Sequence, residues 1–494
     1  MSIRAARKKS PEVVPSETAP KAAHDTRPPQ ALLDFMMEGW KPRGGKLPPR
    51  IKGHAAFLAR RDALSARFPG ETLVVPTGHE KVRANDTNYR FRPGSDFYYL
   101  TGNTEPDCVL VLEPKRGGGH RHLLFVEPNP GRSDETFYTD RAKGELWVGP
   151  RLGVPESQAR YGVDECRPLP ELPGFLSSLG RKTRVLRGYS DGVDRRVEPR
   201  EKEDREFAVV LSEMRLIKDA LEIRELQAAI DSTKRGFEDV IERLAEAQSE
   251  REVEGVFNLR ARVEGNDVGY GTIAASGANA CILHWTKNDA RIRPGELLLL
   301  DAGVERDTLY TADITRTLPI SGKFSKEQRE IYELVLEAQE RAIEAVKPGN
   351  DFMEPNRVAM EVLAHGLERL RILPMSAEEA LRDENQFYKR YSLHNVSHML
   401  GLDVHDCAQA RAEAYKFGKL KPGMVLTVEP GLYFQVDDLT VPARYRGIGI
   451  RIEDDVVVTA RGYRVLSADI PKSAKDVEAW MASIWKQRKA KRRR

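Results

Sequence analysis

Cysteine is scarce in this sequence. The four cysteines, Cys108, Cys166, Cys281 and Cys407, are scattered over 494 residues. They form no Cys-x-x-Cys pair and no spacing typical of a zinc site. A disulfide-rich secreted domain is therefore excluded, and a reduced protein of the cytoplasm is expected.

Long hydrophobic runs are also absent. No stretch of about 18 or more apolar residues occurs, so no membrane-spanning helix and no membrane partner are expected. The basic start, Met1–Lys9, is not followed by an apolar segment, which argues against a secretory signal. Hydrophobic residues make up 40% of the chain and charged residues 31%. A chain of 494 residues with this composition is expected to form at least two globular domains.

Positive charge is concentrated at the two ends. Residues 1–50 contain ten Lys/Arg and five Asp/Glu, and residues 486–494 contain seven Lys/Arg and no acid. The rest has 62 basic and 70 acidic residues, although the whole chain carries +4. A basic tail can contact nucleic acid, but a solvated tail with no dedicated nucleic-acid partner is the simpler interpretation.

The pattern of predicted elements divides the chain into parts. Residues 1–45, rich in Pro, Ala, Lys and Ser, are predicted to be a disordered tail. Residues 46–203 alternate helical and extended runs, which predicts a small α/β domain. Residues 204–485 begin with a linker helix, 204–219, and are predicted to form the larger domain. Residues 486–494 are the basic tail.

Helices and strands of the larger domain do not alternate regularly, which predicts an α+β architecture. Asp219 with Glu222, and Ser325 with Gln328, have the spacing of capping boxes and mark two helix starts. Strands are predicted at Glu296–Leu300, Thr311–Pro319, Met424–Glu429 and Gly449–Thr459.

Acidic and imidazole side chains gather at the ends of these strands. Asp301 follows one strand, and Asp313 lies twelve residues later in the next; in a hairpin the two carboxylates would face each other. Burying them side by side is costly unless something neutralises them. A lone aspartate of this kind is more often a turn or capping residue, but a pair on adjoining strands is harder to explain in that way.

Three of the ten histidines, His394, His398 and His405, fall within twelve residues. Packing alone rarely explains such a cluster, and neutral imidazole is a metal ligand. Glu429 and Glu453 each interrupt an apolar, β-rich run. With a period of two, Glu453 shares one strand face with Arg451, which predicts that it points into a polar site.

Four carboxylates and one imidazole carry four negative charges, which two divalent cations would neutralise. Hard oxygen ligands with one nitrogen suit Mn²⁺ best, with Co²⁺, Fe²⁺ or Zn²⁺ as alternatives. A single zinc site would need fewer acids. The predicted metal ligands are Asp301, Asp313, His398, Glu429 and Glu453.

These segments resemble the metallopeptidase family of pita-bread fold, which includes aminopeptidase P, prolidase and methionine aminopeptidase. Gly94–Gly102 resembles the N-terminal domain shared by aminopeptidase P, prolidase and creatinase, which methionine aminopeptidases lack. The resemblance implies a C-terminal pita-bread domain preceded by a smaller α/β creatinase-like domain. It is carried by Asp301-Ala-Gly, Asp313-Ile-Thr-Arg-Thr, Ser397-His-Met-Leu-Gly-Leu-Asp-Val-His, Thr427-Val-Glu-Pro-Gly-Leu-Tyr and Ile450-Arg-Ile-Glu-Asp-Asp.

The resemblance to aminopeptidase P implies hydrolysis of the N-terminal Xaa-Pro bond of peptides by two metal ions, with release of the first residue. It implies that Asp313, His398 and Glu429 hold one ion, that Glu453 bridges, and that Asp301 chelates the other. A water between the ions would attack the first carbonyl, and Glu429 would pass a proton to the departing proline nitrogen.

The same resemblance implies roles for further residues. His284, His394 and His405 match substrate-contacting or supporting imidazoles, and Arg451 matches an active-site arginine. The alternatives are a strand-end structural role for His284 and an ion pair behind the ligands for Arg451. Tyr98 occupies the position of an aromatic residue that a neighbouring subunit brings near the site in aminopeptidase P.

Two other functions stay open. Prolidase uses the same metals on Xaa-Pro dipeptides, but Ser397 and the Leu-Gly-Leu-Asp-Val-His segment favour aminopeptidase P. A catalytically inactive peptide-binding protein would be expected to lose ligands, and all five are present. The expected partners are a peptide with proline at position two and, by resemblance, further copies of the chain in a dimer or tetramer.

Overall fold

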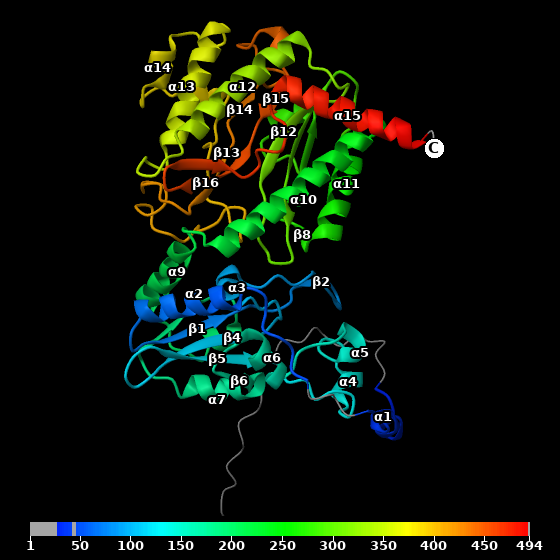
Figure 1. Ribbon diagram of the computed structural model, residues 1–494, viewed down its shortest axis with the longest axis vertical. Helices are drawn as coiled ribbons and strands as arrows, with labels where there is room; N and C mark the ends of the chain where they lie inside the picture. The colour runs from blue at the N-terminus through cyan, green and yellow to red at the C-terminus, as the bar shows by residue number, and fades with distance from the viewer. Residues whose placement is uncertain (1–26, 42–45, 493–494) are drawn as a thin grey trace, which may run out of the picture. The chain divides into compact units, whose positions relative to one another are not determined.

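The computed structural model describes residues 27–41 and 46–492, with side chains up to residue 490 (Figure 1). The chain divides into two units, Met1–Ala208 and Val209–Arg494. The division falls inside helix α9 (Glu201–Met214). None of the helices among the described residues is both long enough and apolar enough to cross a membrane.

The first unit is built on a mixed sheet of five strands. Its inner pairs are antiparallel, and each of the two outer strands pairs in parallel with its neighbour. Helices α2 (His54–Arg67) and α3 (Ser95–Thr101) lie on one face and α7 (Leu172–Ser177) on the other (Figure 1). The strand order is β6 (Glu165–Pro168), β5 (His120–Val126), β4 (Val109–Pro114), β1 (Thr72–Pro76) and β7 (Thr183–Val185).

Helix α1 (Gln30–Met37) forms within the segment predicted to be disordered, so that prediction is wrong for these residues. Leu33 is fully buried against Phe137 and Tyr138. The composition of residues 1–45 is polar on average, and this average concealed one short apolar helix face. The rest of the predicted tail, residues 1–26 and 42–45, lies outside the described residues.

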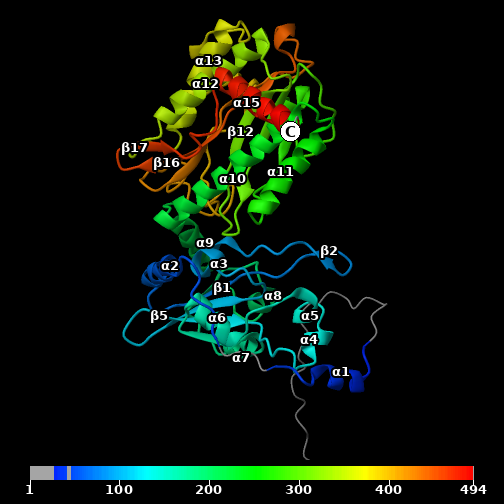
Figure 2. The same cartoon turned by 45° about the vertical axis from the view of Figure 1, so that its right-hand side comes forward.

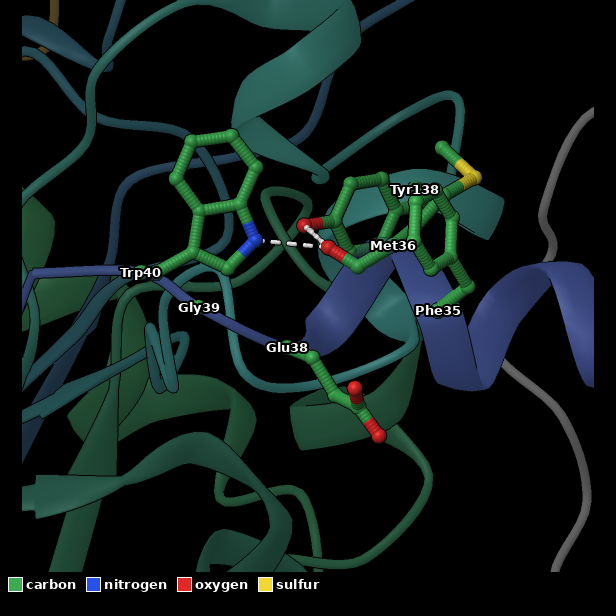
Figure 3. Close-up of a pocket in the computed structure, with 6 residues that line it drawn as sticks. All are labelled: Phe35, Met36, Glu38, Gly39, Trp40 and Tyr138. Atoms are coloured by element: carbon green, nitrogen blue, oxygen red, sulfur yellow. Dashed lines mark hydrogen bonds between the residues drawn. The ribbon is translucent and has the colours of Figure 1, made fainter.

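Around α1 lies an apolar pocket of about 510 Å³. Its wall is held by two hydrogen bonds to one carbonyl: the Trp40 indole N–H and the Tyr138 hydroxyl each donate to the Met36 oxygen at 2.6 Å (Figure 3). None of the predicted site residues lines this pocket, which is formed by Phe35, Met36, Glu38, Gly39, Trp40 and Tyr138.

The second unit combines long helices with short antiparallel sheets (Figure 2). The helices are α10 (Ala220–Leu244), α11 (Glu250–Glu264), α12 (Lys326–Glu344), α13 (Glu354–Arg369) and α15 (Ala474–Arg492). One sheet has the order β12 (Ile314–Pro319), β10 (Leu297–Ala302) and β9 (Ile273–Ser276). A second has the order β13 (Val425–Val428), β16 (Asp454–Thr459) and β17 (Gly462–Val465), and β14 (Gly431–Tyr433) pairs with β15 (Gly449–Arg451).

Both predicted capping boxes are confirmed, at Asp219 and Ser325. The strand predicted over Gly449–Thr459 is instead two strands in different sheets. The chain leaves the first at Ile452, and the Glu453 N–H donates to the Thr315 carbonyl of β12 at 3.1 Å. Glu453 therefore lies at the junction of the two sheets, where its side chain is not confined to the face of one strand.

The C-terminal basic tail begins inside α15. The Arg488 guanidinium donates to the Glu242 carbonyl and the Glu246 carboxylate, and the Trp485 indole N–H donates to the Ile241 carbonyl at 2.6 Å. Within the segment predicted to be a solvated tail, Arg488 therefore contacts α10, whereas Lys486, Gln487, Lys489 and Ala490 are exposed. Residues 493–494 lie outside the described part.

A glycine sets the spacing between α12 and α13. A β-carbon added at Gly366 would lie 2.2 Å from Leu334 Cδ1 and 2.8 Å from its Cγ, and Leu334 is buried. Gly366→Ala should therefore destabilise the second unit by about 1–3 kcal/mol through overpacking. Gly255 in α11 has no atom within 4 Å of such a carbon. Gly255→Ala should stabilise by about 0.5–1 kcal/mol. Denaturant unfolding measures both, and equal signs would contradict this account of the interface.

A buried arginine faces a buried histidine in the first unit. The Arg61 guanidinium donates to His122 Nδ1 at 3.3 Å and to the Leu100 carbonyl at 2.8 Å, and neither Arg61 nor His122 is appreciably exposed. Burial, assisted by the Arg61 charge, lowers the pKa of His122 to about 4. The folded protein therefore keeps this imidazole neutral, with Nδ1 as an acceptor.

The lowered pKa of His122 predicts a loss of stability in acid. Below the unfolded pKa of about 6.5 the unfolded chain takes up a proton that the folded chain refuses, so this loss develops between about pH 6.5 and 4. His122→Asn keeps an acceptor for Arg61 and removes the titration. Unfolding of the first unit at pH 7 and pH 4.5 should show a smaller acid loss in His122→Asn than in wild type or in the exposed control His365→Asn. An unchanged loss would refute the assignment.

Candidate metal centre and active site

The strands β10 and β12 bring two aspartates together. They pair antiparallel, with Asp301 opposite Thr315, as the hairpin prediction required. The Tyr270 hydroxyl oxygen lies 2.7 Å from Asp301 Oδ1 and 2.5 Å from Asp313 Oδ1. The two carboxylates therefore lie side by side, next to the same hydroxyl group. A hydroxyl has one hydrogen, so Tyr270 can donate to only one of them at a time.

Three of the predicted ligands lie closest together. One ligand atom each from Asp313, His398 and Glu453 can be chosen so that all lie within 4.8 Å of one another. His398 Nε2 is 3.2 Å from Asp313 Oδ2. Glu453 is 1% exposed, and its Oε2 accepts a hydrogen bond from the Thr315 hydroxyl at 2.6 Å. Two carboxylates and one imidazole at this separation can hold a divalent cation.

Glu429 follows β13 and lies between two imidazoles. Its N–H donates to the Val396 carbonyl at 2.8 Å, which fixes the backbone. Its Oε1 lies 3.5 Å from His398 Nε2, and its Oε2 lies 3.6 Å from His394 Nδ1. Glu429 therefore joins the ligand group on one side and the remaining histidines on the other.

Burial raises the pKa values of three of the clustered acids. Burial raises the pKa of Glu429 to about 7, opposed by the charges of His398 and Arg451. Burial and the neighbouring carboxylates raise the pKa of Glu453 well above its usual range. Burial also raises the pKa of Asp301. Divalent cations would restore the charged forms, so the donor set fits such ions.

Arg451 donates hydrogen bonds to one acid of the cluster and to two neighbouring hydroxyl groups. It is 3% exposed and donates through Nη2 to Asp301 Oδ2, through Nη1 to the Tyr433 hydroxyl at 3.0 Å and through Nε to the Thr315 hydroxyl at 3.2 Å. Arg451 and Glu453 thus both reach Thr315, although Glu453 lies between two strands and the predicted single strand of period two does not account for it.

Asp454 points away from this site. It accepts hydrogen bonds from Arg316, Gln339 and Ser467. Asp455 is fully buried and accepts from the Asp313 N–H at 3.2 Å. Glu453, Asp454 and Asp455 are adjacent in the sequence, but their carboxylates accept hydrogen bonds from different groups.

The other predicted histidines lie around the same cluster. His394 Nε2 is 2.8 Å from the Tyr433 hydroxyl, and burial, with the Arg451 charge, lowers the pKa of His394 to about 4. The His405 ring lies edge-on to the His398 ring with centroids 4.4 Å apart. His284 is exposed in a turn rather than at a strand end. Its neighbours on either side pack against the core cluster that contains Tyr433.

Tyr98, in α3, packs against α2 within the first unit. It is 4% exposed and packs edge-on against Phe57, with centroids 6.0 Å apart.

Three site residues were not predicted from the sequence. Tyr433 ends the segment Thr427-Val-Glu-Pro-Gly-Leu-Tyr, so its closeness in sequence to Glu429 is a signal for a hydroxyl near the ligands. Thr315 pairs with Asp301 only through the strand register. Tyr270 precedes β9 with no local pattern to mark it, and only the tertiary structure places it between Asp301 and Asp313.

Comparison with known families agrees with this architecture. Residues 224–460 match metallopeptidase family M24, and residues 57–186 match the aminopeptidase P N-terminal domain. The fold and the domain pair therefore define a metallopeptidase of family M24 with an N-terminal domain of the aminopeptidase P type. The predicted pita-bread domain with a smaller α/β domain before it is confirmed.

Individual relatives show to which group of the M24 metallopeptidases the chain is most similar. The chain is 51% identical over 457 residues to Xaa-Pro aminopeptidase 1 of Streptomyces coelicolor, covering 92% of each chain. It is 36% identical to Xaa-Pro aminopeptidase of Escherichia coli over 450 residues, 87% of this chain and 98% of the relative. A structure of E. coli aminopeptidase P with the inhibitor Pro-Leu matches with a TM-score of 0.79 at 34% identity, covering 88% of this chain and all of that one. The chain belongs to the aminopeptidase P family.

The fit of the cluster to divalent cations predicts stabilisation by metal. Mn²⁺ at about 100 times its Kd should raise the free energy of unfolding by about 2.7 kcal/mol, and chelator should remove the gain. Glu453→Gln should lose most of this gain. Glu478→Gln, whose carboxylate bonds Lys323 and Arg329 outside the cluster, is the matched control and should keep it. Thermal unfolding with and without Mn²⁺ measures both, and an equal shift in the two variants would exclude Glu453 as a ligand.

Proposed function

We propose that this protein is an Xaa-Pro aminopeptidase that removes the N-terminal residue from peptides whose second residue is proline. The observation that carries the proposal is the convergence of the buried carboxylates of Asp301, Asp313 and Glu453 with the half-buried Glu429 and His398 in the M24 domain. The relatives named Xaa-Pro aminopeptidase, at up to 51% identity, support the substrate class.

Two divalent cations would be held by this cluster, and Mn²⁺ is the proposed metal. The residues that would hold them are Asp301, Asp313, His398, Glu429 and Glu453. When bound, the ions would activate a water as nucleophile and polarise the first peptide carbonyl. The 4.8 Å group of Asp313, His398 and Glu453 supports this assignment.

The chain's own groups would then bind and orient the peptide. His284, His394 and His405 would contact it, with His394 oriented by the Tyr433 hydroxyl at 2.8 Å. The Glu429 carboxylate, which lies between the two imidazoles, would pass a proton to the departing proline nitrogen. Arg451 keeps Asp301 in position through the Nη2 hydrogen bond.

Proline at the second position sets a particular recognition problem. The bond before proline is a tertiary amide whose nitrogen carries no hydrogen and whose φ is fixed. Peptidases that recognise this N–H cannot bind it. A site that holds the carbonyl and the first residue, and leaves room for a ring, can bind such a substrate.

The setting of the enzyme is part of the proposal. All four cysteines are free and buried, which fits a reducing compartment such as the cytoplasm. A homo-oligomer, either a dimer or a tetramer, is the proposed assembly. Size-exclusion chromatography with light scattering would measure it.

Substrate length distinguishes aminopeptidase P from prolidase. With Mn²⁺, the protein should release alanine from Ala-Pro-Ala and leave Ala-Ala-Ala intact. Hydrolysis confined to Ala-Pro would assign prolidase instead, and no hydrolysis with metal bound would favour an inactive binding protein. Chromatographic detection of free alanine, with chelator as control, measures all three.

Loss of Glu453 should remove the activity and leave the fold. Glu453→Ala should lower kcat by more than about 100-fold, the upper range for losing an outer-shell partner of a metal ligand. Circular dichroism should be unchanged, with Glu478→Ala as the matched control for loss of a buried carboxylate. Near-normal turnover in Glu453→Ala would refute the bridging role.

A further inference from the structure

A buried ion pair lies directly behind His405. Lys218 Nζ donates to Asp406 Oδ2 at 2.9 Å, and the two side chains are 0% and 1% exposed. Arg215 adds a second cation, with Nη2 3.3 Å from Asp406 Oδ1. The Lys218 and Arg215 charges keep the pKa of Asp406 below its usual value despite burial. The cluster touches none of the five metal ligands, and the mechanism above assigns it no task.

The segment that carries His405 has little regular structure to hold it. From Gly401 to Cys407 the chain forms neither helix nor strand, and His405 itself is exposed. Cys407 has a φ of +62°, a backbone conformation that a non-glycine residue adopts only when its surroundings impose it. An exposed imidazole on such a loop needs a neighbour that fixes it.

Asp406 provides this fixation. Its N–H donates to the Met399 carbonyl at 2.9 Å, which closes the turn between His398 and His405. Its carboxylate points inward to Lys218. A β-carbon at Gly401 would lie 2.2 Å from Asp406 Oδ2 and 3.0 Å from Lys218 Cε, so the glycine lets the loop close over the pair.

Lys218 is itself held rigidly. Its N–H donates to the Gly423 carbonyl at 2.8 Å, just before β13. The next residue, Asp219, is the N-cap of α10 and forms its capping box. The lysine thus connects the start of α10 to the loop that bears His405.

We propose that Lys218, acting through Asp406, is a positioning residue that holds the His405 imidazole beside His398 for contact with the peptide. This inference rests on the proposed aminopeptidase function for its kinetic consequence only. Displacement of a substrate-contacting group by about 1 Å costs on the order of 10²-fold in rate. The buried pair therefore matters to catalysis although it touches neither substrate nor metal.

A double-mutant cycle tests the coupling. Lys218→Met keeps the length of the side chain and removes its charge, and kcat/KM for Ala-Pro-Ala should fall on the order of 10²-fold with bound Mn²⁺ unchanged. In a His405→Ala background the same change should cost little more, because the group it positions is already gone. Additive losses would overturn the proposal. Arg260→Met, which breaks the ion pair with Asp239 between α10 and α11, is the control and should leave kcat/KM unaltered.

Two further measurements separate positioning from folding. Lys218→Met removes one cation beside the buried Asp406, and Lys218→Met/Asp406→Asn also removes that anion, so that Arg215 keeps its ion pair with Asp403; the Tm of the double variant should recover while kcat/KM stays low. Full recovery of kcat/KM would overturn the proposal. A crystal structure of Lys218→Met should show the His405 ring displaced from its 4.4 Å contact with His398, and an unmoved ring would refute the inference. Absence of hydrolysis by wild type would refute the proposed function alone, since the ring position still decides this inference.

Discussion

The cost of crowding carboxylates in a buried space governs this structure. Asp301, Asp313, Glu429 and Glu453 lie around one centre, where three of the four residues are buried and Glu429 is half-buried. Burial penalises each negative charge, and each neighbour adds to the penalty. Such an arrangement is stable in its charged form only when cations occupy it. The crowding of carboxylates therefore both destabilises the fold without metal and creates the site for divalent cations.

Hydrogen-bond donors from several strands and loops stabilise the clustered carboxylates. Thr315 of β12 donates to Glu453, Tyr270 lies between two aspartates, and Arg451 of β15 reaches both Asp301 and Thr315. Each donor fixes a carboxylate orientation before a metal arrives. Pre-set ligands of this kind lower the reorganisation that binding and catalysis would otherwise require.

A second buried acid is handled differently. Asp406 is matched by Lys218 and Arg215 from the protein itself, and its charge needs no external ion. The contrast separates two uses of buried charge in one domain. Acids left without enough internal cations form the metal centre, and an acid with its own cations holds a loop.

The sequence by itself determined which acids and imidazole form the cluster, the hairpin of β10 and β12, and the capped starts of α10 and α12, because these depend on local spacing and on charge balance within short segments. Tertiary structure alone decided the rest. It divided the run Gly449–Thr459 between two sheets, folded α1 and the start of the basic tail onto other helices, and brought Tyr270 and Lys218 to residues far along the chain. The physical reason is that contacts between distant segments follow from how helices and sheets pack, and local pattern carries no record of that packing.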